Sequence, residues 1–426
     1  MLIILGFLFL VAIGMPVGFC MVLTGFFYII STGTAPLTMV PQAMVSGVSS
    51  YTMLAIPFFI VVGELMNSSG ITRRIFNFSN AVVGHITGGL GLVNVLASMI
   101  FAGMSGSAVA DAAGLGAIEI KAMKDEGFDA DFAVGITAAS SILGPIIPPS
   151  SPMVLFGIVS GVSIGAMFMG GILPGILLGI FQMIVVYFIA KKRGYPKNKR
   201  ATFVQLASAF WSALPALLCP ILLIGGIFSG FFTPTEAAAV ALFYALFVGF
   251  FVYKELTLKG LWKVLSAAIE NLGIVMLLMA SGKLFSWVLG MDRIAEHLTT
   301  ALFSVTNNPT IILLFINILL LIAGTFMETN ASIFILTPIL LPIALKIGMH
   351  PVQFGIMMIF NLMIGLITPP MAIILFITSR IGGISFERSF KAVKPYFLVM
   401  LLTLLLMATI PGLTLAVPKL ILGKAF

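Results

Sequence analysis

Apolar segments separated by short polar stretches make up almost the whole chain. In the first half they fall at 2–14, 17–30, 52–66, 90–104, 107–124, 130–164 and 166–190. In the second half they fall at 209–229, 235–253, 264–290, 310–325, 331–348, 352–379 and 393–417. A run of roughly 20 apolar residues is long enough to cross a bilayer as a helix. The pattern therefore predicts an all-α integral membrane protein.

The two halves of the chain repeat one order of segments on either side of a basic linker, 191–200. In each half an amphipathic stretch precedes two short apolar arms, and a long segment interrupted by prolines follows them. Gly103 matches Gly324, and Gly144 matches Gly365 at the same spacing. We interpret this order as an internal repeat, which is typical of secondary transporters.

Two pairs of short arms, 90–104 with 107–124 and 310–325 with 331–348, are each joined by a polar tip. An arm of about 15 residues extends ~22 Å as a helix, which is less than the ~30 Å of hydrocarbon. We therefore expect two re-entrant hairpins with tips near the bilayer midplane. Each half then crosses the membrane an odd number of times, which inverts the second half. A single helix over 2–30 would remove this inversion.

Two spans are interrupted by prolines, at GPIIPPSS from Gly144 and at GLITPP from Gly365. Proline lacks a backbone N–H and clashes with the preceding turn, so both spans are predicted to be broken helices. Unwound backbone at membrane depth is tolerated only where protein buries it or where it lines a wet cavity. Paired broken spans in two half-chains indicate the binding site of a transporter.

The charges indicate orientation in a membrane. Apolar residues make up 60% of the chain and charged residues 8%, with a mean hydropathy of +1.19. Most of the 22 Lys and Arg fall on one side of the predicted topology, together with the linker. Because cytoplasmic loops are enriched in these residues, we expect a cytoplasmic linker and two periplasmic termini. The net charge of +8 therefore does not indicate a nucleic-acid partner.

Both hairpin tips are unusually polar for membrane depth: GMSGS begins at Gly103 and GTFMETN begins at Gly324. At each tip and break one helix ends with unpaired carbonyls and another starts with unpaired amides. Carbonyl ends with hydroxyl oxygens suit a hard cation, whereas amide ends suit an anion. The alternative is that these residues only cap helices and let the arms pack closely.

Several ionisable residues fall within apolar segments, where burying a charge is costly. Asp111 and Glu328 lie at the start of a returning arm, so capping is our first interpretation and cation attraction our second. Glu64 and Lys283 occupy matching positions of the repeat, which suggests pairing with each other or with a partner subunit.

The chain resembles the large membrane subunit of tripartite ATP-independent periplasmic (TRAP) transporters over essentially its whole length. The stretches that carry the resemblance are MPVGF at 15–19, GMSGSAVADAAGLG at 103–116, SILGPIIPPS at 141–150, FTPTEAAA at 232–239 and LITPPM at 366–371. The resemblance implies sodium-coupled import of an organic acid, sialic acid or a C4-dicarboxylate, across a bacterial inner membrane. It also implies two partners, a small membrane subunit of about four helices and a periplasmic substrate-binding protein. The first segment is most similar to the sialic acid branch.

The resemblance further implies an inverted-repeat, elevator-type transporter in which the hairpins and broken spans move against a scaffold. The moving part would be 90–164 and 310–379. The scaffold would be 1–89, 165–200 with the linker, 201–309 and 380–426. Na⁺ would be the coupling ion, and no organic cofactor is expected.

Two sodium sites are predicted, each between a hairpin tip and the neighbouring break. The residues of the first are Gly103, Ser105, Ser107, Ser140 and Gly144. Those of the second are Gly324, Thr325, Asn361, Gly365 and Thr368. Because the tips and breaks contain no Arg or Lys, we expect helix-start amides and bound sodium to hold the substrate carboxylate. The side chains expected around it are Ser107, Ser150, Thr329 and Asn330.

Three other functions stay open at this point. A transporter of similar architecture would work without a binding protein. An intramembrane enzyme would need a pair of catalytic groups at depth, which only Asp111 and Glu328 approach. A channel would conduct ions without ligand.

The predicted topology places Arg73 and Lys197 in the cytoplasm and Asn307 with the C-terminus in the periplasm. Single cysteines at these positions, in a chain lacking Cys20 and Cys219, are expected to react with an impermeant reagent only from those sides. Reaction of position 197 from the periplasm alone would contradict the topology.

Overall fold

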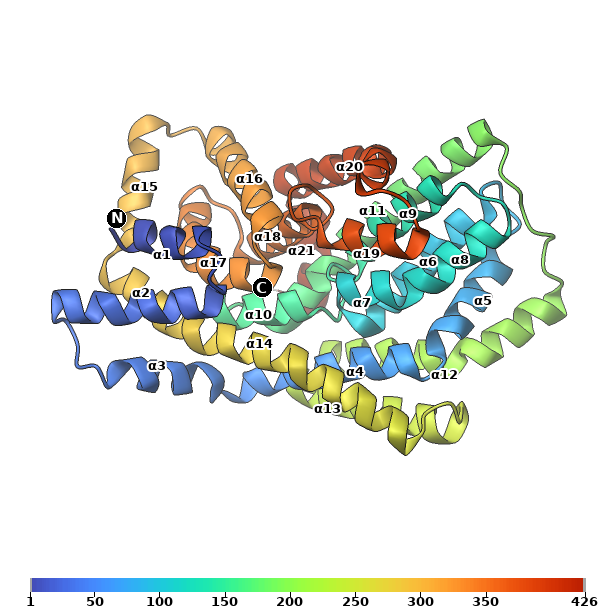
Figure 1. Cartoon of the computed structure of the whole chain (residues 1–426), viewed down its shortest axis with the longest axis horizontal. Coiled ribbons are helices and arrows are strands. Elements are labelled where there is room, and N and C mark those ends of the chain that lie inside the picture. Colours follow the sequence, from blue (N-terminus) through green and yellow to red (C-terminus); the bar gives the residue numbers. More distant parts are fainter. Residues whose placement is uncertain (1, 424–426) are drawn as a thin grey trace.

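The computed structural model describes residues 2–423, and every regular element within that range is helical (Figure 1). The first half contains α1(Leu2–Ala12), α2(Val17–Thr32), α3(Met39–Val48), η1(Tyr51–Leu54), α4(Ala55–Ser68), α5(Ile71–Val83), α6(Gly89–Ser105), α7(Ala108–Ala113), α8(Leu115–Asp125), α9(Ala130–Ser140), η2(Ser141–Leu143), α10(Ser151–Ser160) and α11(Ile164–Arg193). The second half contains α12(Phe203–Phe228), α13(Pro234–Phe247), η3(Val248–Val252), α14(Leu258–Met291), α15(Ile294–Val305), α16(Pro309–Phe326), α17(Thr329–Lys346), α18(Pro351–Gly365), α19(Ile373–Gly382), α20(Phe386–Thr409) and α21(Gly412–Leu422). Among the described residues, 8 helices are long and apolar enough to cross a membrane. The prediction of an all-α membrane protein is confirmed.

The apolar region 2–30 forms two helices rather than one. Gly14 adopts a φ of +86°, which favours glycine, and Pro16 is the N-cap of α2. The chain therefore turns between α1 and α2. With 11 residues, α1 extends only ~16 Å and is shorter than the hydrocarbon core.

Two features of the helix pattern differ from the sequence analysis. α3 was not predicted; it lies end to end with α4, and α14 packs against both (Figure 1). The 34-residue α14 is their single counterpart in the second half. The segment predicted at 393–417 is two helices, because α20 ends at Thr409 and Pro411 is the N-cap of α21.

Both predicted hairpins are present. α6 returns as α7 and α8, which meet at Gly114, and α16 returns as α17. The arms of the second hairpin have 18 residues each, or about 27 Å, so they are longer than expected. Length alone does not distinguish them from spanning helices. Their tip, however, packs against the break between α18 and α19, which identifies the pair as a hairpin.

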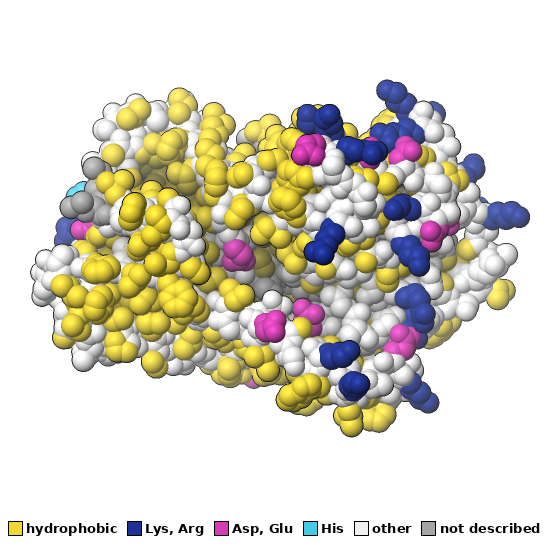
Figure 2. Space-filling view, in the orientation of Figure 1, with side chains coloured by type: hydrophobic (Ala, Val, Ile, Leu, Met, Phe, Trp, Pro, Cys, Tyr) yellow, Lys and Arg dark blue, Asp and Glu magenta, His cyan; other side chains and the backbone are white. Residues whose placement is uncertain are grey.

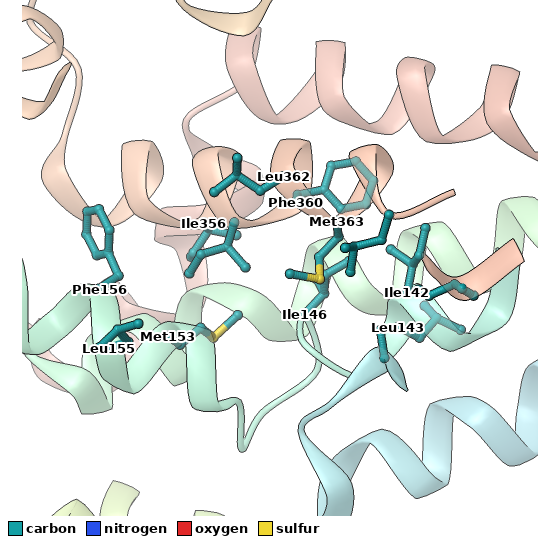
Figure 3. Packing of buried hydrophobic residues seen from close by; sticks show 14 of the residues in the cluster. Ile142, Leu143, Ile146, Met153, Leu155, Phe156, Ile356, Phe360, Leu362 and Met363 are labelled. Carbon is teal, nitrogen blue, oxygen red and sulfur yellow. The ribbon is translucent and has the colours of Figure 1, made fainter. Parts of the chain in front are cut away.

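The two broken spans form the centre of the molecule. Figure 3 shows side chains of the first break and α10, among them Ile146 and Met153, packing against Phe360 and Met363 of α18. The described residues of α18 from Val352 onward are all buried. Burial of these apolar side chains holds the two breaks side by side.

The remaining helices pack in two groups. α11 and α20 pack on α9, and α11 also contacts α6 and α18. α4, α12, α13 and α14 pack on one another, and α5 lies between α12 and α6. The boundaries expected at 165 and 380 divide the first group, since they separate α11 and α20 from the helices on which they pack.

Lys and Arg gather at one end of the long axis of the molecule (Figure 2). α5 and the linker that follows α11 lie at this end, whereas α15 lies at the other (Figure 1). This distribution agrees with the predicted cytoplasmic side. Met1 and residues 424–426 lie outside the described residues, so the side of the termini stays a prediction.

The linker forms hydrogen bonds with the rest of the chain at two points, Tyr195 and Asn198. The Tyr195 hydroxyl donates to the Asp129 carboxylate at 2.6 Å, just before α9. Three residues further on, Asn198 donates from its backbone N–H to the Gly84 carbonyl at 3.0 Å and from Nδ2 to Asn80 Oδ1 at 3.0 Å, at the end of α5. The linker therefore connects the start of α9 with the end of α5.

Candidate functional site

The first hairpin tip packs directly on the first break. Gly106 adopts a φ of +57°, and a Cβ there would lie 2.6 Å from the Pro149 carbonyl oxygen. A Cβ on Gly144 would lie 3.2 Å from the Ser107 carbonyl oxygen. Only glycine permits this approach of backbone to backbone. The peptide bond between Pro148 and Pro149 is cis.

The second tip packs on the second break in the same way. A Cβ on Gly365 would overlap the backbone of Gly324, and a Cβ on Gly324 would lie 2.9 Å from the Leu362 carbonyl oxygen. The Met371 amide donates to the Thr325 carbonyl at 3.4 Å. The predicted pairing of each tip with its neighbouring break is therefore present in the fold.

Two of the residues expected around the substrate are helix caps. Ser107 Oγ accepts from the Ala110 amide at 3.3 Å, and Ser150 Oγ accepts from the Met153 amide at 3.3 Å. The Ser150 hydroxyl also donates to the Pro145 carbonyl at 2.6 Å. Capping is thus one role of these two side chains, as the alternative interpretation expected.

The two carboxylates at the starts of returning arms differ. Glu328 is the N-cap of α17, where its Oε2 accepts from the Ala331 amide at 3.1 Å, so its predicted capping role is confirmed. Asp111 lies in the first turn of α7, as predicted, while Ser107 supplies the N-cap of that helix. Both Asp111 oxygens are buried without hydrogen-bond geometry to any described partner.

One side chain predicted for the first ion site, that of Ser140, lies in a polar layer between α6 and α9. The Ser140 hydroxyl donates to Asn94 Oδ1 at 2.7 Å and accepts from Ser98 at 3.2 Å. Ser105 Oγ is buried and has no partner among the described residues. Hydroxyl oxygens beside the carbonyls of the tip are suitable ligands for a hard cation.

The second predicted ion site has the same plan. Asn361 donates from Nδ2 to Asn317 Oδ1 at 2.8 Å, and its own Oδ1 is buried with no described partner. Thr325 donates to the Ile322 carbonyl and Thr368 donates to the Ile364 carbonyl, each at 2.8 Å. Their oxygens keep free lone pairs for a cation.

Asn94 and Asn317 were not among the residues predicted from the sequence. These residues lie at corresponding places on the first arms of the two hairpins, where each contacts a predicted ion-site residue of the broken span. An asparagine inside an apolar arm, repeated in both halves, was the available signal. Glu119 was also not predicted; it is buried and accepts from Asn94 at 2.6 Å.

A cavity of about 550 Å³ lies between the two tips and the second group of helices. On one side the two tips and Ala110, Ala113 and Gly114 of the first hairpin line it. On the other side α4 contributes Ile56, Ile60 and Glu64, and α14 contributes Asn271 and Ile274. The cavity thus runs between the hairpins and the wall formed by α4 and α14.

Most of the side chains expected around the substrate line this cavity. Ser107, Thr329 and Asn330 line it, whereas Ser150 is buried and only its neighbour Ser151 lines the cavity. Apart from Ser105 and Ser107, the residues predicted for the ion sites lie behind the cavity, in the contacts between tip and break. Among the described residues that line it there is no Lys, Arg or His.

The sequence matches the family of the DctM component of tripartite ATP-independent periplasmic transporters over residues 4–413. The chain belongs to this family. The permease is 47% identical to the sialic acid TRAP transporter large permease protein SiaM of Vibrio cholerae, over 99% of this chain and 98% of SiaM. It is 42% identical to the sialic acid TRAP transporter permease protein SiaT of Haemophilus influenzae, over 98% of this chain and 68% of SiaT.

The fold of the permease is similar to that of the YdaH transporter of Alcanivorax borkumensis, with a TM-score of 0.59. The alignment covers 83% of this chain and 84% of YdaH at 15% identity, so the similarity concerns the fold alone. The predicted all-helical membrane fold and the predicted family of the permease are both confirmed.

The substitution Gly365→Ala tests the contact between tip and break. The added methyl overlaps the Gly324 backbone, so we expect a loss of stability of about 1–3 kcal/mol and loss of transport. A fluorescence-based thermal melt of the purified permease measures the first effect. Gly290→Ala is the control, because a Cβ at that position on α14 meets no atom within 4 Å. Equal melting temperatures for both variants would contradict the importance of this contact.

Proposed function

We propose that the permease imports sialic acid, coupled to sodium and delivered by a periplasmic substrate-binding protein. The proposal rests on the arrangement around the cavity. Each of the two hairpin tips packs against a break, and the cavity beside both tips has no Lys, Arg or His among its described lining residues. SiaM and SiaT, which match nearly the whole chain, are named for sialic acid.

Sodium has a suitable set of oxygens at each tip. The first site comprises Gly103, Ser105, Ser107, Ser140 and Gly144, and the second comprises Gly324, Thr325, Asn361, Gly365 and Thr368. Buried oxygens of Ser105 and Asn361 have no described partner, and a bound cation would compensate for their burial. Sodium supplies positive charge beside the cavity and fastens each tip to its break.

The substrate carboxylate then lies between the tips, on side chains rather than on free amides. Glu328 already accepts from the Ala331 amide at the start of α17, so that helix start is not free for an anion. Thr329, whose Oγ1 is buried without a described partner, Asn330 and Ser107 provide hydrogen bonds. Bound sodium supplies the charge.

Transport follows by movement of one group of helices against the other. We propose that α6 to α11 and α16 to α20 move as one body, because α11 and α20 pack on α6, α9 and α18. α4 and α12 to α14 form the scaffold. This division keeps the hairpins and broken spans together, as the elevator mechanism requires. It adds α11 and α20 to the moving part of the permease, which we call the mover.

The permease works with partners in a bacterial inner membrane. A tripartite transporter has three components, and this chain corresponds to one of them. Because this chain covers only 68% of SiaT, the rest of SiaT has room for a small membrane subunit fused to its permease. We propose that this permease binds a separate subunit of that kind and a periplasmic binding protein.

Sodium and substrate are expected to increase each other's affinity by the same factor. Calorimetric titration of the purified complex with sialic acid, in sodium and in potassium, measures this coupling. Lys283→Ala is expected to leave it unchanged, because Lys283 does not line the cavity. Equal affinity in both salts, or loss of binding in a folded Lys283→Ala permease, would overturn the proposed ion and substrate sites.

A further inference from the structure

Glu64 faces the tips of the hairpins from the wall formed by α4 and α14. It lines the cavity, and its neighbour Gly63 approaches the first tip so closely that a Cβ would lie 3.1 Å from the Ser105 carbonyl oxygen. Asn67, one turn further along α4, approaches Gly114 of the same hairpin. This half of α4 therefore runs along the first hairpin, with the Glu64 carboxylate beside the cavity.

The charge of Glu64 has little local compensation. Its Oε1 accepts from Asn271 Nδ2 at 3.4 Å, a long contact with a neutral donor. Lys283, its counterpart in the repeat, is twelve positions beyond Asn271 on α14, or about 18 Å away along the helix, and lies against Gly47 of α3. Pairing of Glu64 with Lys283, one of the two expectations from the sequence, is therefore wrong.

The position of Glu64 along α4 makes its effect depend on the position of the mover. α4 ends at Ser68, next to α5 at the Lys- and Arg-rich end of the molecule (Figure 1). The first tip lies level with residue 63, near that end. Towards the other end the same wall presents Ile56 and Ile60, and Ile56 is about 12 Å from Glu64 along the helix.

We propose that Glu64 promotes release of the substrate: its carboxylate repels the substrate carboxylate when the tips stand at the cytoplasmic end of the scaffold. This inference rests on the proposed import of an anionic substrate. When the mover carries the tips towards the periplasm, the substrate faces Ile56 and Ile60 instead and escapes the repulsion. A charge that acts in one state only changes the balance between binding outside and release inside.

The test measures net sodium-driven uptake of sialic acid by proteoliposomes that contain the complete transporter. The binding protein is supplied outside only, and sialic acid is loaded inside at increasing concentrations. A charge pair within ~8 Å at intermediate dielectric corresponds to about three- to tenfold in affinity. Glu64→Gln is therefore expected to be inhibited by internal sialic acid at about three- to tenfold lower concentration. The concentration of external, substrate-loaded binding protein that gives half-maximal uptake should be the same for Glu64→Gln as for the wild type.

Two further variants separate charge from structure. Glu64→Asp keeps the charge and is expected to restore the wild-type inhibition. Glu270→Gln removes a charge at nearly the same level of α14, but from an exposed residue outside the cavity, and should behave as wild type. Equal inhibition of Glu64→Gln and wild type, or the same shift in Glu270→Gln, would overturn the role of Glu64. Absence of sodium-dependent sialic acid uptake by the wild-type complex would instead overturn the proposed function, and with it the basis of this inference.

Discussion

The structure depends on one constraint, which is that unwound backbone inside a membrane must be enclosed by protein or water. Two helices break and two hairpins turn at membrane depth, so four sets of helix ends need partners. The chain meets this need by placing each tip against a break through glycines at positions 106, 144, 324 and 365. The packing of α10 on α18 then joins both contacts in one centre.

The same enclosure explains why the polar residues lie where they do. Ser140 and Asn361 stand where a broken span passes the first arm of a hairpin, and each binds an asparagine of that arm. A polar layer of this kind satisfies the backbone and side chains around it and leaves a few oxygens without protein donors. The proposed cation sites therefore rely on these neutral oxygens, because the carboxylate on the second tip, that of Glu328, caps α17.

Glycine and proline made much of this architecture predictable from sequence. PP in apolar surroundings and the polar tips GMSGS and GTFMETN are strong local signals, and the same order of tip and break in both halves identified the hairpins, the breaks and their pairing. The sequence gives weaker signals for long-range side-chain partners. Asn94, Asn317 and Glu119 look like isolated polar residues until the fold brings them to the broken spans. The position of Ser107 as the N-cap of α7, with Asp111 in the first turn, depends on a local backbone angle that residue types alone do not determine.

The linker between the two halves has a mechanical consequence. Tyr195 is bonded to Asp129 beside α9, and Asn198 is bonded to the end of α5. Three residues span at most roughly 10 Å when fully extended, so this stretch acts as a tether of fixed reach. Any displacement of α9 from α5 beyond that reach must first break one of these attachments. The tether thus opposes separation of α9 and α5 with the free energy of a few hydrogen bonds, about 1 kcal/mol each. Thermal motion or a bound partner has to supply this free energy before the two helices can move further apart.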